Sequence, residues 1–166
     1  MISLERLHRT CFALLFQGAD AGVLAQYAEQ FTEKVVPDLI HRKIQDALLR
    51  AQEMGSEVWI MSSSPECVVR PIARMLGVSD VYATAYETDT KGCFCSVRDI
   101  VCGAKKVRKI KSVLQELKLS QADLACYSDS CEDLEVLKMA GHAVAVNPDR
   151  IVRQVALKNG WQIVCG

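Results

Sequence analysis

The 166 residues carry 20 basic and 20 acidic side chains, and half of all residues are hydrophobic. This composition suits one domain with a substantial core, and a formal net charge of zero gives no general attraction to nucleic acid or to an anionic membrane. No run approaches the roughly 18 apolar residues of a membrane span, and the first residues lack the pattern of a secretory signal. Eight cysteines at irregular spacing indicate reduced thiols. We therefore expect a cytoplasmic protein that binds neither nucleic acid nor membrane.

Residues 2–36 are predicted to be helical, because apolar side chains recur at every third or fourth position. The segment CFALLF (11–16) could instead form a buried strand, and helix is the favoured choice. Pro37 is expected to open a second helix that ends at Gly55. On that helix His41 is expected to lie in solvent, near the polar side. The predicted buried stripe of the helix consists of Leu39, Ile40, Ile44, Ala47, Leu48, Ala51 and Met54.

A strand is predicted over residues 57–61, and it leads directly into Ser62, Ser63 and Ser64. Ser64 suits a helix N-cap and Pro65 suits the first helical position, so a helix should follow as far as Gly77. Free N–H groups at a helix N-terminus, next to hydroxyls, form a ready anion site. The alternative is that the three serines only cap the helix.

From residue 57 onward the predicted elements alternate between strand and helix, which indicates a parallel, doubly wound sheet. Turn residues within 87–98 also predict a hairpin or a short excursion from the sheet. The remaining strands are expected at 81–86, 124–127, 143–146 and 161–164, and the remaining helices at 104–117, 134–140 and from Pro148 to Gly160.

Two acids follow the short apolar strand 124–127, in the sequence LACYSDSCEDLEVL (124–137). Asp129 and Asp133 lie four residues apart, at the point where an open α/β sheet places its ligand crevice. Carboxylates there suit Mg²⁺, which is usually held by one or two carboxylates, waters and a substrate phosphate. Alternatively, the two acids only complement the dipole of the following helix.

Lys106 lies in the first turn of the predicted helix 104–117. A cation at a helix N-terminus opposes the helix dipole, so its position there calls for a reason. The other basic residues of this helix are expected to form a solvated face, and they do not indicate nucleic-acid binding because no aromatic residues are interleaved among them.

These motifs, in this order, resemble the haloacid dehalogenase-like superfamily and, within it, the phosphoserine-phosphatase-like branch. The resemblance is carried by VWIMSSSPECVVRPIARMLGV (58–78), CGAKKVRKI (102–110), YSDSCEDLEVL (127–137) and AVAVNPD (143–149). It implies a Rossmann-like α/β core over residues 57–166 and a helical, cap-like segment over residues 1–56. It also implies a small phosphorylated metabolite as the substrate and Mg²⁺ as the cofactor.

The resemblance further implies a role for each site residue. Ser62 would hydrogen-bond a phosphoryl oxygen, with Ser63 and Ser64 lending backbone N–H groups. Lys106 and Asp133 would be catalytic residues, with Lys106 neutralising charge on the nucleophile and on the transferring phosphoryl group. Asp129 would bind Mg²⁺, with Asp133 as its second ligand or its support.

The chain departs from the family pattern at the first motif, a strand followed by Asp-x-Asp that supplies the nucleophile and the acid/base. The 166 residues contain no Asp-x-Asp, and Asp20 lacks a partner two residues away. Ser128 and Glu132 are lesser departures. The missing motif belongs to the family's first core strand, so we expect that strand to be missing here. In the family this strand lies in the middle of the sheet. We then expect an unstable isolated chain, or a gap filled by CFALLF, by a second copy or by a strand-completing partner.

Three functions remain open at this point. The first is a Mg²⁺-dependent phosphomonoester hydrolase, truncated and therefore inactive or weakly active as this chain. The second is a catalytically inert binding or regulatory module of the same fold. The third is another α/β protein, such as a response-regulator-like or nucleotide-binding domain, although no Gly-rich phosphate loop of standard spacing is present.

Overall fold

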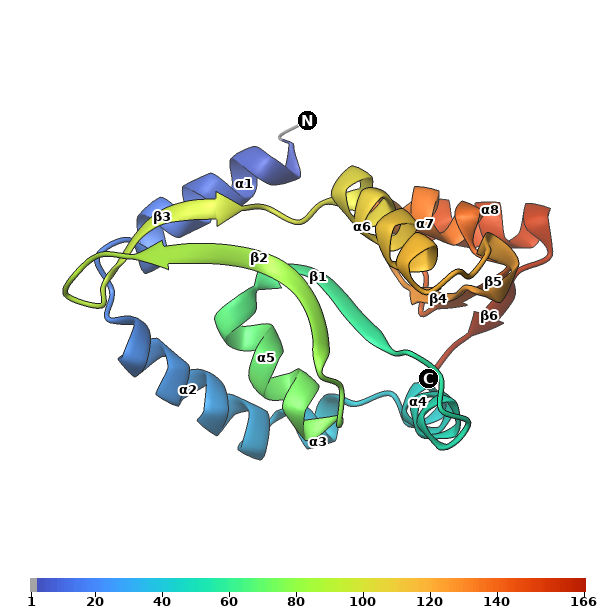
Figure 1. Ribbon diagram of the computed structural model, residues 1–166, viewed down its shortest axis with the longest axis horizontal. Helices are drawn as coiled ribbons and strands as arrows, with labels where there is room; N and C mark the ends of the chain where they lie inside the picture. The colour runs from blue at the N-terminus through green and yellow to red at the C-terminus, as the bar shows by residue number, and fades with distance from the viewer. Residues whose placement is uncertain (1–2) are drawn as a thin grey trace. The chain divides into compact units, whose positions relative to one another are not determined.

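The computed structural model describes residues 3–166, and the chain divides into two compact units, Met1–Val101 and Cys102–Gly166 (Figure 1). Helices alternate with mostly parallel strands, which confirms the predicted α/β class. The units do not divide at the predicted boundary between residues 56 and 57, and the separate roles of segments 1–56 and 57–166 stay a prediction. The absence of the family's first core strand also stays a prediction.

The first unit begins with four helices and a wide helical turn. These are α1 (Leu4–Cys11), a π-helical turn (Phe12–Phe16), α2 (Ala21–Lys34), α3 (Val36–Leu39) and α4 (Arg42–Glu53). Segment 11–16 is therefore helical, as favoured, and it does not fill a gap in a sheet. Asp20 is the N-cap of α2, where its carboxylate accepts a hydrogen bond from the Val23 N–H at 3.0 Å.

The single helix predicted from Pro37 to Gly55 is wrong, because Ile40 and His41 have extended backbone and separate α3 from α4. The predicted burial of its apolar stripe is also wrong. No residue of α4 is buried, and the flanking Leu39 and Met54 are 68% and 82% exposed. The two ring nitrogens of His41 are shielded from solvent, so its predicted solvation is wrong as well. The chain bends at this residue instead of carrying it on the outer face of a helix.

The sheet of the first unit has the order β1-β2-β3, with β1 (Trp59–Pro65) parallel to β2 (Asp80–Thr88) and β3 (Phe94–Asp99) antiparallel to β2. The β2–β3 pair confirms the hairpin predicted within 87–98. Helix α5 (Glu66–Met75) packs against β1 and β2, and α2 packs on α5 (Figure 1). Pro65 caps α5 instead of opening it, so the helix begins one residue later than predicted.

An aromatic cluster attaches the π-helical turn to the hairpin. The ring of Tyr86 lies edge-on to Phe12, Phe16 and Phe94, with centroid separations of 4.8, 5.2 and 5.6 Å. Burial raises the pKa of Tyr86 to about 12. These contacts fix the N-terminal segment to the strands of its own unit.

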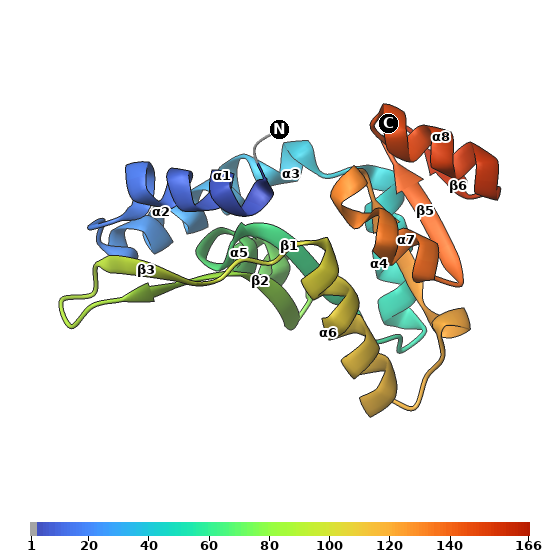
Figure 2. The same cartoon turned by 90° about the horizontal axis from the view of Figure 1, so that it is seen from above.

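The second unit contains α6 (Gly103–Glu116), β4 (Ala125–Ser128), α7 (Leu134–Met139), β5 (His142–Val146), α8 (Arg150–Asn159) and β6 (Gln162–Val164), seen from above in Figure 2. Its three strands are parallel, in the order β4-β5-β6. Ala143 and Ala145 share one face of β5 and form one core cluster with Leu137 of α7 and with Val152 and Ala156 of α8. Helices α7 and α8 therefore cover the same face of this sheet.

Among residues 3–166 no helix has the length and apolarity needed to cross a membrane.

Candidate functional site

The predicted site residues fall in both units, and each group is described within its own unit. Ser62, Ser63 and Ser64 lie in β1 of the first unit. Lys106, Asp129 and Asp133 lie in the second unit, on α6 and around the end of β4. The meeting of the two groups at one crevice stays a prediction.

The serine segment forms an irregularity in the β1–β2 ladder. Ser62 pairs with Ala83 and Pro65 pairs with Thr84, so Ser63 and Ser64 lie between two consecutive rungs. The hydroxyl of Ser62 accepts a hydrogen bond from the Ser64 N–H at 3.1 Å. Such bulges re-aim a strand where it ends and are common beside active sites.

Thr84 holds this irregular segment from the neighbouring strand. Its side chain is fully buried, donates to the Ser63 carbonyl at 2.6 Å and accepts from the Val101 N–H at 3.1 Å. One hydroxyl thus satisfies two backbone groups that the β1–β2 ladder does not pair. Sequence reasoning missed this residue, because a threonine in VYATAY has the ordinary composition of a strand.

Lys106 and Asp133 form a buried ion pair in the second unit. The lysine ammonium donates to both carboxylate oxygens, at 2.8 and 3.0 Å, and the two side chains are 8% and 15% exposed. Asp133 also accepts from the Ser128 hydroxyl at 2.8 Å. A buried ammonium group without a partner would be strongly destabilising, and the Asp133 carboxylate provides that partner. The ion pair therefore explains why a lysine lies in the first turn of α6.

Gly103 makes the ion pair possible, because it allows the first turn of α6 to approach the short 3-10 turn Cys131–Asp133. A Cβ atom at Gly103 would lie 2.3 Å from the carbonyl oxygen of Glu132, which is backbone and cannot rotate away. Any side chain at this position would force the two turns apart. Sequence reasoning missed this role, although a glycine opening a helix is itself an unusual signal.

Asp129 follows β4 directly, and its side chain is exposed. Within residues 3–166 its carboxylate makes no hydrogen bond or ion pair, in contrast to Asp133. Asp129 is thus a carboxylate of this loop that is available to a cation from solution, and Glu132 is a second exposed acid there.

Asp149 fastens the loop that carries the two acids to helix α8. Its N–H donates to the Asp129 carbonyl at 3.2 Å, and its carboxylate accepts from the N–H groups of Cys131 and Val152 at 3.1 and 2.8 Å. These hydrogen bonds, above all the one from Val152, hold the pKa of Asp149 below its usual value. The position of Asp129 therefore depends on a residue 20 positions later in the chain.

The partly buried thiol of Cys126 on β4 lies close enough to the ion pair to interact with both of its charges. Burial, with a smaller effect of the Asp133 charge, raises the pKa of Cys126 on β4 to about 12. The nearby Lys106 charge opposes this rise only in part.

The residues present fit a hard cation only in part. One available carboxylate, Asp129, and a second that is shared with Lys106 suit Mg²⁺ completed by water and a phosphate. Across residues 3–166 there is no group of three or more His, Cys, Asp or Glu side chains arranged to hold a metal. The second unit thus offers the exposed carboxylate of Asp129 and, four residues later, a carboxylate that is paired with an ammonium group.

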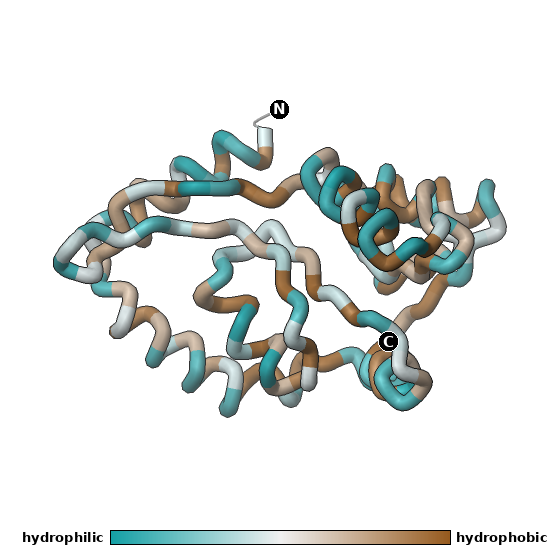
Figure 3. The backbone as a smooth tube through the Cα atoms, in the orientation of Figure 1, coloured by the Kyte–Doolittle hydropathy of each residue, from teal (hydrophilic) through white to brown (hydrophobic). Residues whose placement is uncertain are grey.

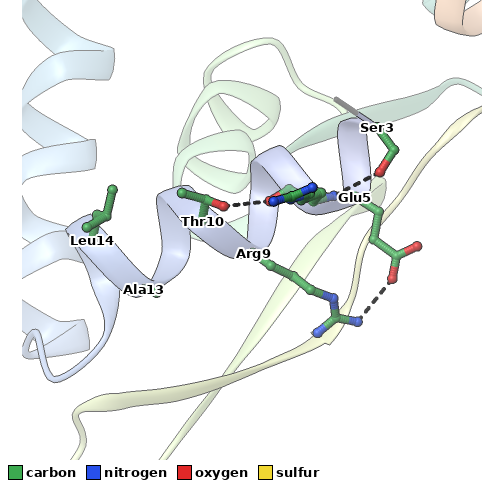
Figure 4. A pocket seen from close by; sticks show the side chains of 7 residues that line it. Ser3, Glu5, Arg9, Thr10, Ala13 and Leu14 are labelled. Atoms are coloured by element: carbon green, nitrogen blue, oxygen red, sulfur yellow. Dashed lines mark hydrogen bonds and ion pairs between the residues drawn. The ribbon is translucent and has the colours of Figure 1, made fainter. Parts of the chain in front are cut away.

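A separate hollow of about 500 Å³ lies along α1 (Figure 4). It contains none of the predicted site residues, and two of its side chains, Arg9 and Glu5, are paired with each other at 3.1 Å. The hollow is lined by Ser3, Glu5, Arg6, Arg9, Thr10, Ala13 and Leu14.

Comparisons with known proteins concern the family and the fold of the chain. The family described as haloacid dehalogenase-like hydrolase matches residues 2–138. Phosphoserine phosphatase SerB1 of Mycobacterium tuberculosis is 29% identical over 154 residues, which cover 91% of this chain and 50% of that protein. The histidinol-phosphatase of Neisseria meningitidis serogroup C is 28% identical over 149 residues, which cover 85% and 66%.

Among solved structures, the probable phosphoserine phosphatase from Vibrio cholerae shares the fold, with a TM-score of 0.74 and 15% identity over 92% of this chain and 45% of that one. The chain spans about half the length of the first curated relatives it matches.

Proposed function

Because the chain belongs to the haloacid dehalogenase-like hydrolase family, we propose that its 166 residues carry the phosphate- and Mg²⁺-binding groups of a phosphomonoester hydrolase. The observation that carries the proposal is the buried Lys106–Asp133 pair next to the available carboxylate of Asp129. A protein gains little stability from burying such a pair, whereas a phosphoryl-transfer site needs a fixed cation beside a metal ligand.

Each residue has a role in this proposal. Lys106, oriented by Asp133, neutralises negative charge on the phosphoryl group, and Ser62 donates its hydroxyl to a phosphoryl oxygen. In this proposal the N–H group of the bulged Ser63 contributes to phosphate binding at the start of α5, and the N–H group of Ser64, which donates to the Ser62 hydroxyl in the structure, would turn to the phosphate on binding.

Asp129 would hold Mg²⁺, supported by Asp133, and the ion when bound supplies positive charge that neutralises phosphate oxygens. Ser128 donates to Asp133 and keeps the second carboxylate turned toward Lys106. The substrate class that fits is a small phosphorylated metabolite. The free cysteines suit a cytoplasmic setting.

As this chain, the protein is proposed to hydrolyse phosphomonoesters weakly or not at all. The resemblance assigns the nucleophile to an Asp-x-Asp motif, and no such motif occurs in the 166 residues. Uncatalysed phosphomonoester hydrolysis is among the slowest of biological reactions. By analogy with a protease triad, loss of the nucleophile costs about a millionfold in turnover.

The second candidate is an inert binding module with the same fold, which the absent Asp-x-Asp favours. The two candidates differ in the DNA that precedes the Met1 codon. A strand followed by Asp-x-Asp encoded in frame supports the hydrolase, and its absence supports the inert module.

Hydrolysis of p-nitrophenyl phosphate with and without Mg²⁺ tests the assigned roles. We expect trace turnover at most, and any turnover should require Mg²⁺ and disappear in Asp129→Ala. The matched control is Glu135→Ala, an exposed acid of α7 that is paired with Lys138. Turnover that survives Asp129→Ala would contradict the assignment of Asp129.

A further inference from the structure

A threonine occupies a fully buried position in the middle of β2, with buried alanines on either side of it. Valine has nearly the same shape and would fill this position without burying a polar group. A buried hydroxyl loses its hydrogen bonds to water, so it is tolerated only where other groups replace them. The hydroxyl of Thr84 makes two hydrogen bonds, and both go to backbone groups. The threonine therefore points to a need to hold those backbone groups.

The two hydrogen bonds of Thr84 have opposite directions. Its oxygen accepts from the Val101 N–H at 3.1 Å, and its proton is donated to the Ser63 carbonyl at 2.6 Å. A hydroxyl carries only one proton, and because the Val101 N–H is a donor, that proton is left for Ser63. Hydrogen bonds that are joined in a chain polarise and strengthen one another. Val101 and Thr84 together therefore hold the Ser63 carbonyl in a fixed direction.

The hydrogen bond from Thr84 orients a whole peptide unit. The Ser63 carbonyl and the Ser64 N–H belong to one planar, trans peptide group, in which these two bonds point in opposite directions. Thr84 holds the carbonyl end, and the N–H end donates to the Ser62 hydroxyl at 3.1 Å. The peptide between Ser63 and Ser64 is thus fixed at both ends, inside the irregular part of the β1–β2 ladder.

We propose that Thr84 is a positioning residue for phosphate binding, which acts on the serine segment through the Ser63–Ser64 peptide. This inference rests on the proposed role of Ser62. The Ser62 oxygen accepts from the Ser64 N–H, so its own proton is left for a phosphoryl oxygen. The held carbonyl also keeps the Ser64 N–H on the side of Ser62, where the phosphate would bind. Without the Thr84 hydroxyl this peptide is free to rotate, and both donors lose their direction.

Titration of the full chain with inorganic phosphate in the presence of Mg²⁺ tests this role, with Thr84→Val and Thr84→Ser as a pair. Thr84→Val keeps the shape and removes the hydroxyl, so it should weaken phosphate binding by roughly tenfold, as loss of a supporting hydrogen bond does in metal sites. Thr84→Ser keeps the hydroxyl and should bind phosphate nearly as well as the unaltered chain. All variants are compared at a temperature at which circular dichroism shows them to be folded.

The matched control is Val78→Ala, which removes apolar contacts of a buried side chain just before β2 and no hydrogen bond. This variant should lower the stability of the first unit without changing its phosphate affinity. Equal affinity of Thr84→Val and the unaltered chain would overturn the proposal. So would an equal loss of affinity in Thr84→Val and Val78→Ala, because destabilisation alone would then account for it.

Amide exchange in the ligand-free chain, followed by NMR, gives a readout that needs no phosphate. The Ser64 amide should exchange with solvent several-fold faster in Thr84→Val than in Thr84→Ser, because its peptide is no longer held. The Phe94 amide, which donates to the Ala19 carbonyl at 2.9 Å, should not change. Unchanged exchange at Ser64 would overturn the proposal. If Ser64 exchanged faster but the unaltered chain bound no phosphate, the proposed function would fail and the anchoring by Thr84 would stand.

Discussion

The two units differ in how far some of their helices bury apolar residues. In the second unit Leu137, Ala145, Val152 and Ala156 are completely buried, and they form one cluster between the strands and helices α7 and α8. In the first unit Leu14, Leu15, Tyr27 and Leu39 are between 63% and 77% exposed. Figure 3 shows hydrophobic segments on the helices of the first unit as well as on strands.

The difference follows from what the helices of each unit can pack on. Helices α7 and α8 cover one face of a sheet, which hides their apolar stripes. Helices α1 and α4 have amphipathic sequences, yet neither contains a buried residue. Apolar periodicity predicts that a helix forms, but it does not establish that a surface is present to cover the stripe. The second unit should therefore be the more stable. Each unit contains one tryptophan, Trp59 in the first and Trp161 in the second, so the unfolding of each unit can be followed by its own fluorescence.

The largest effect is expected from breaking the buried ion pair. Lys106→Met should lower the free energy of unfolding of the second unit by about 3–5 kcal/mol, because Asp133 keeps a buried charge without its partner. Urea unfolding followed by Trp161 fluorescence in a Trp59→Phe background measures this change.

The control for this prediction is Lys138→Met, which removes a lysine from an exposed pair with Glu135 and should cost no more than about 0.5 kcal/mol. The double variant Lys106→Met/Asp133→Leu should regain most of the loss. A loss as small as that of Lys138→Met would show that the pair is solvated.

The next effect concerns the approach of two turns within the second unit. Gly103→Ala should destabilise it by about 1–3 kcal/mol, because the new methyl group overlaps the Glu132 carbonyl. Gly141→Ala provides a match, since a Cβ there would lie 2.5 Å from the Ala122 carbonyl oxygen, away from the ion pair. Both variants should lose stability, but only Gly103→Ala should also lose phosphate affinity. Equal loss of affinity in both would refute a positioning role for Gly103.

A comparable or smaller effect is expected in the first unit from Thr84→Val, which keeps the shape of the side chain and removes its hydroxyl. The Ser63 carbonyl and the Val101 N–H then lose a partner, at a cost of about 1–2 kcal/mol. Trp59 fluorescence during urea unfolding reports the change, with Thr88→Val at the exposed end of β2 as the control. If Trp161 responded instead, the two units would not unfold separately.

The smallest effect is a pH dependence that comes from Asp149. Its pKa is lowered in the folded state, so its contribution to stability is present above the unfolded pKa of about 4 and is lost as the pH falls through the lowered folded value. Asp149→Asn should flatten the fall in the urea midpoint of the second unit below about pH 4. An unchanged pH profile would mean that other carboxylates control the acid limb.

Sequence reasoning found most elements, because they depend on local pattern, whereas the assignment of the site residues stays a prediction. The order of strands and helices after residue 57, the helical choice for segment 11–16 and the placement of Lys106 in a first helical turn follow from periodicity and turn residues. The roles of Ser62, Asp129 and Asp133 rested on the resemblance.

What could not be predicted depends on contacts between distant segments. The partner of Lys106 lies 27 positions away, and the contact requires that Gly103 have no side chain. The break at Ile40 and His41 has no Gly or Pro to mark it, so periodicity alone ran through it. The two buried bonds of Thr84 are equally invisible in a strand-like sequence.

Binding of inorganic phosphate in the presence of Mg²⁺, followed by isothermal titration calorimetry, tests the central claim most directly. The unaltered chain should bind phosphate only when Mg²⁺ is present, Asp129→Asn and Lys106→Met should each abolish that binding, and Glu135→Gln should leave it intact. Phosphate binding that is indifferent to Mg²⁺, or that persists in both Asp129→Asn and Lys106→Met, would contradict the account.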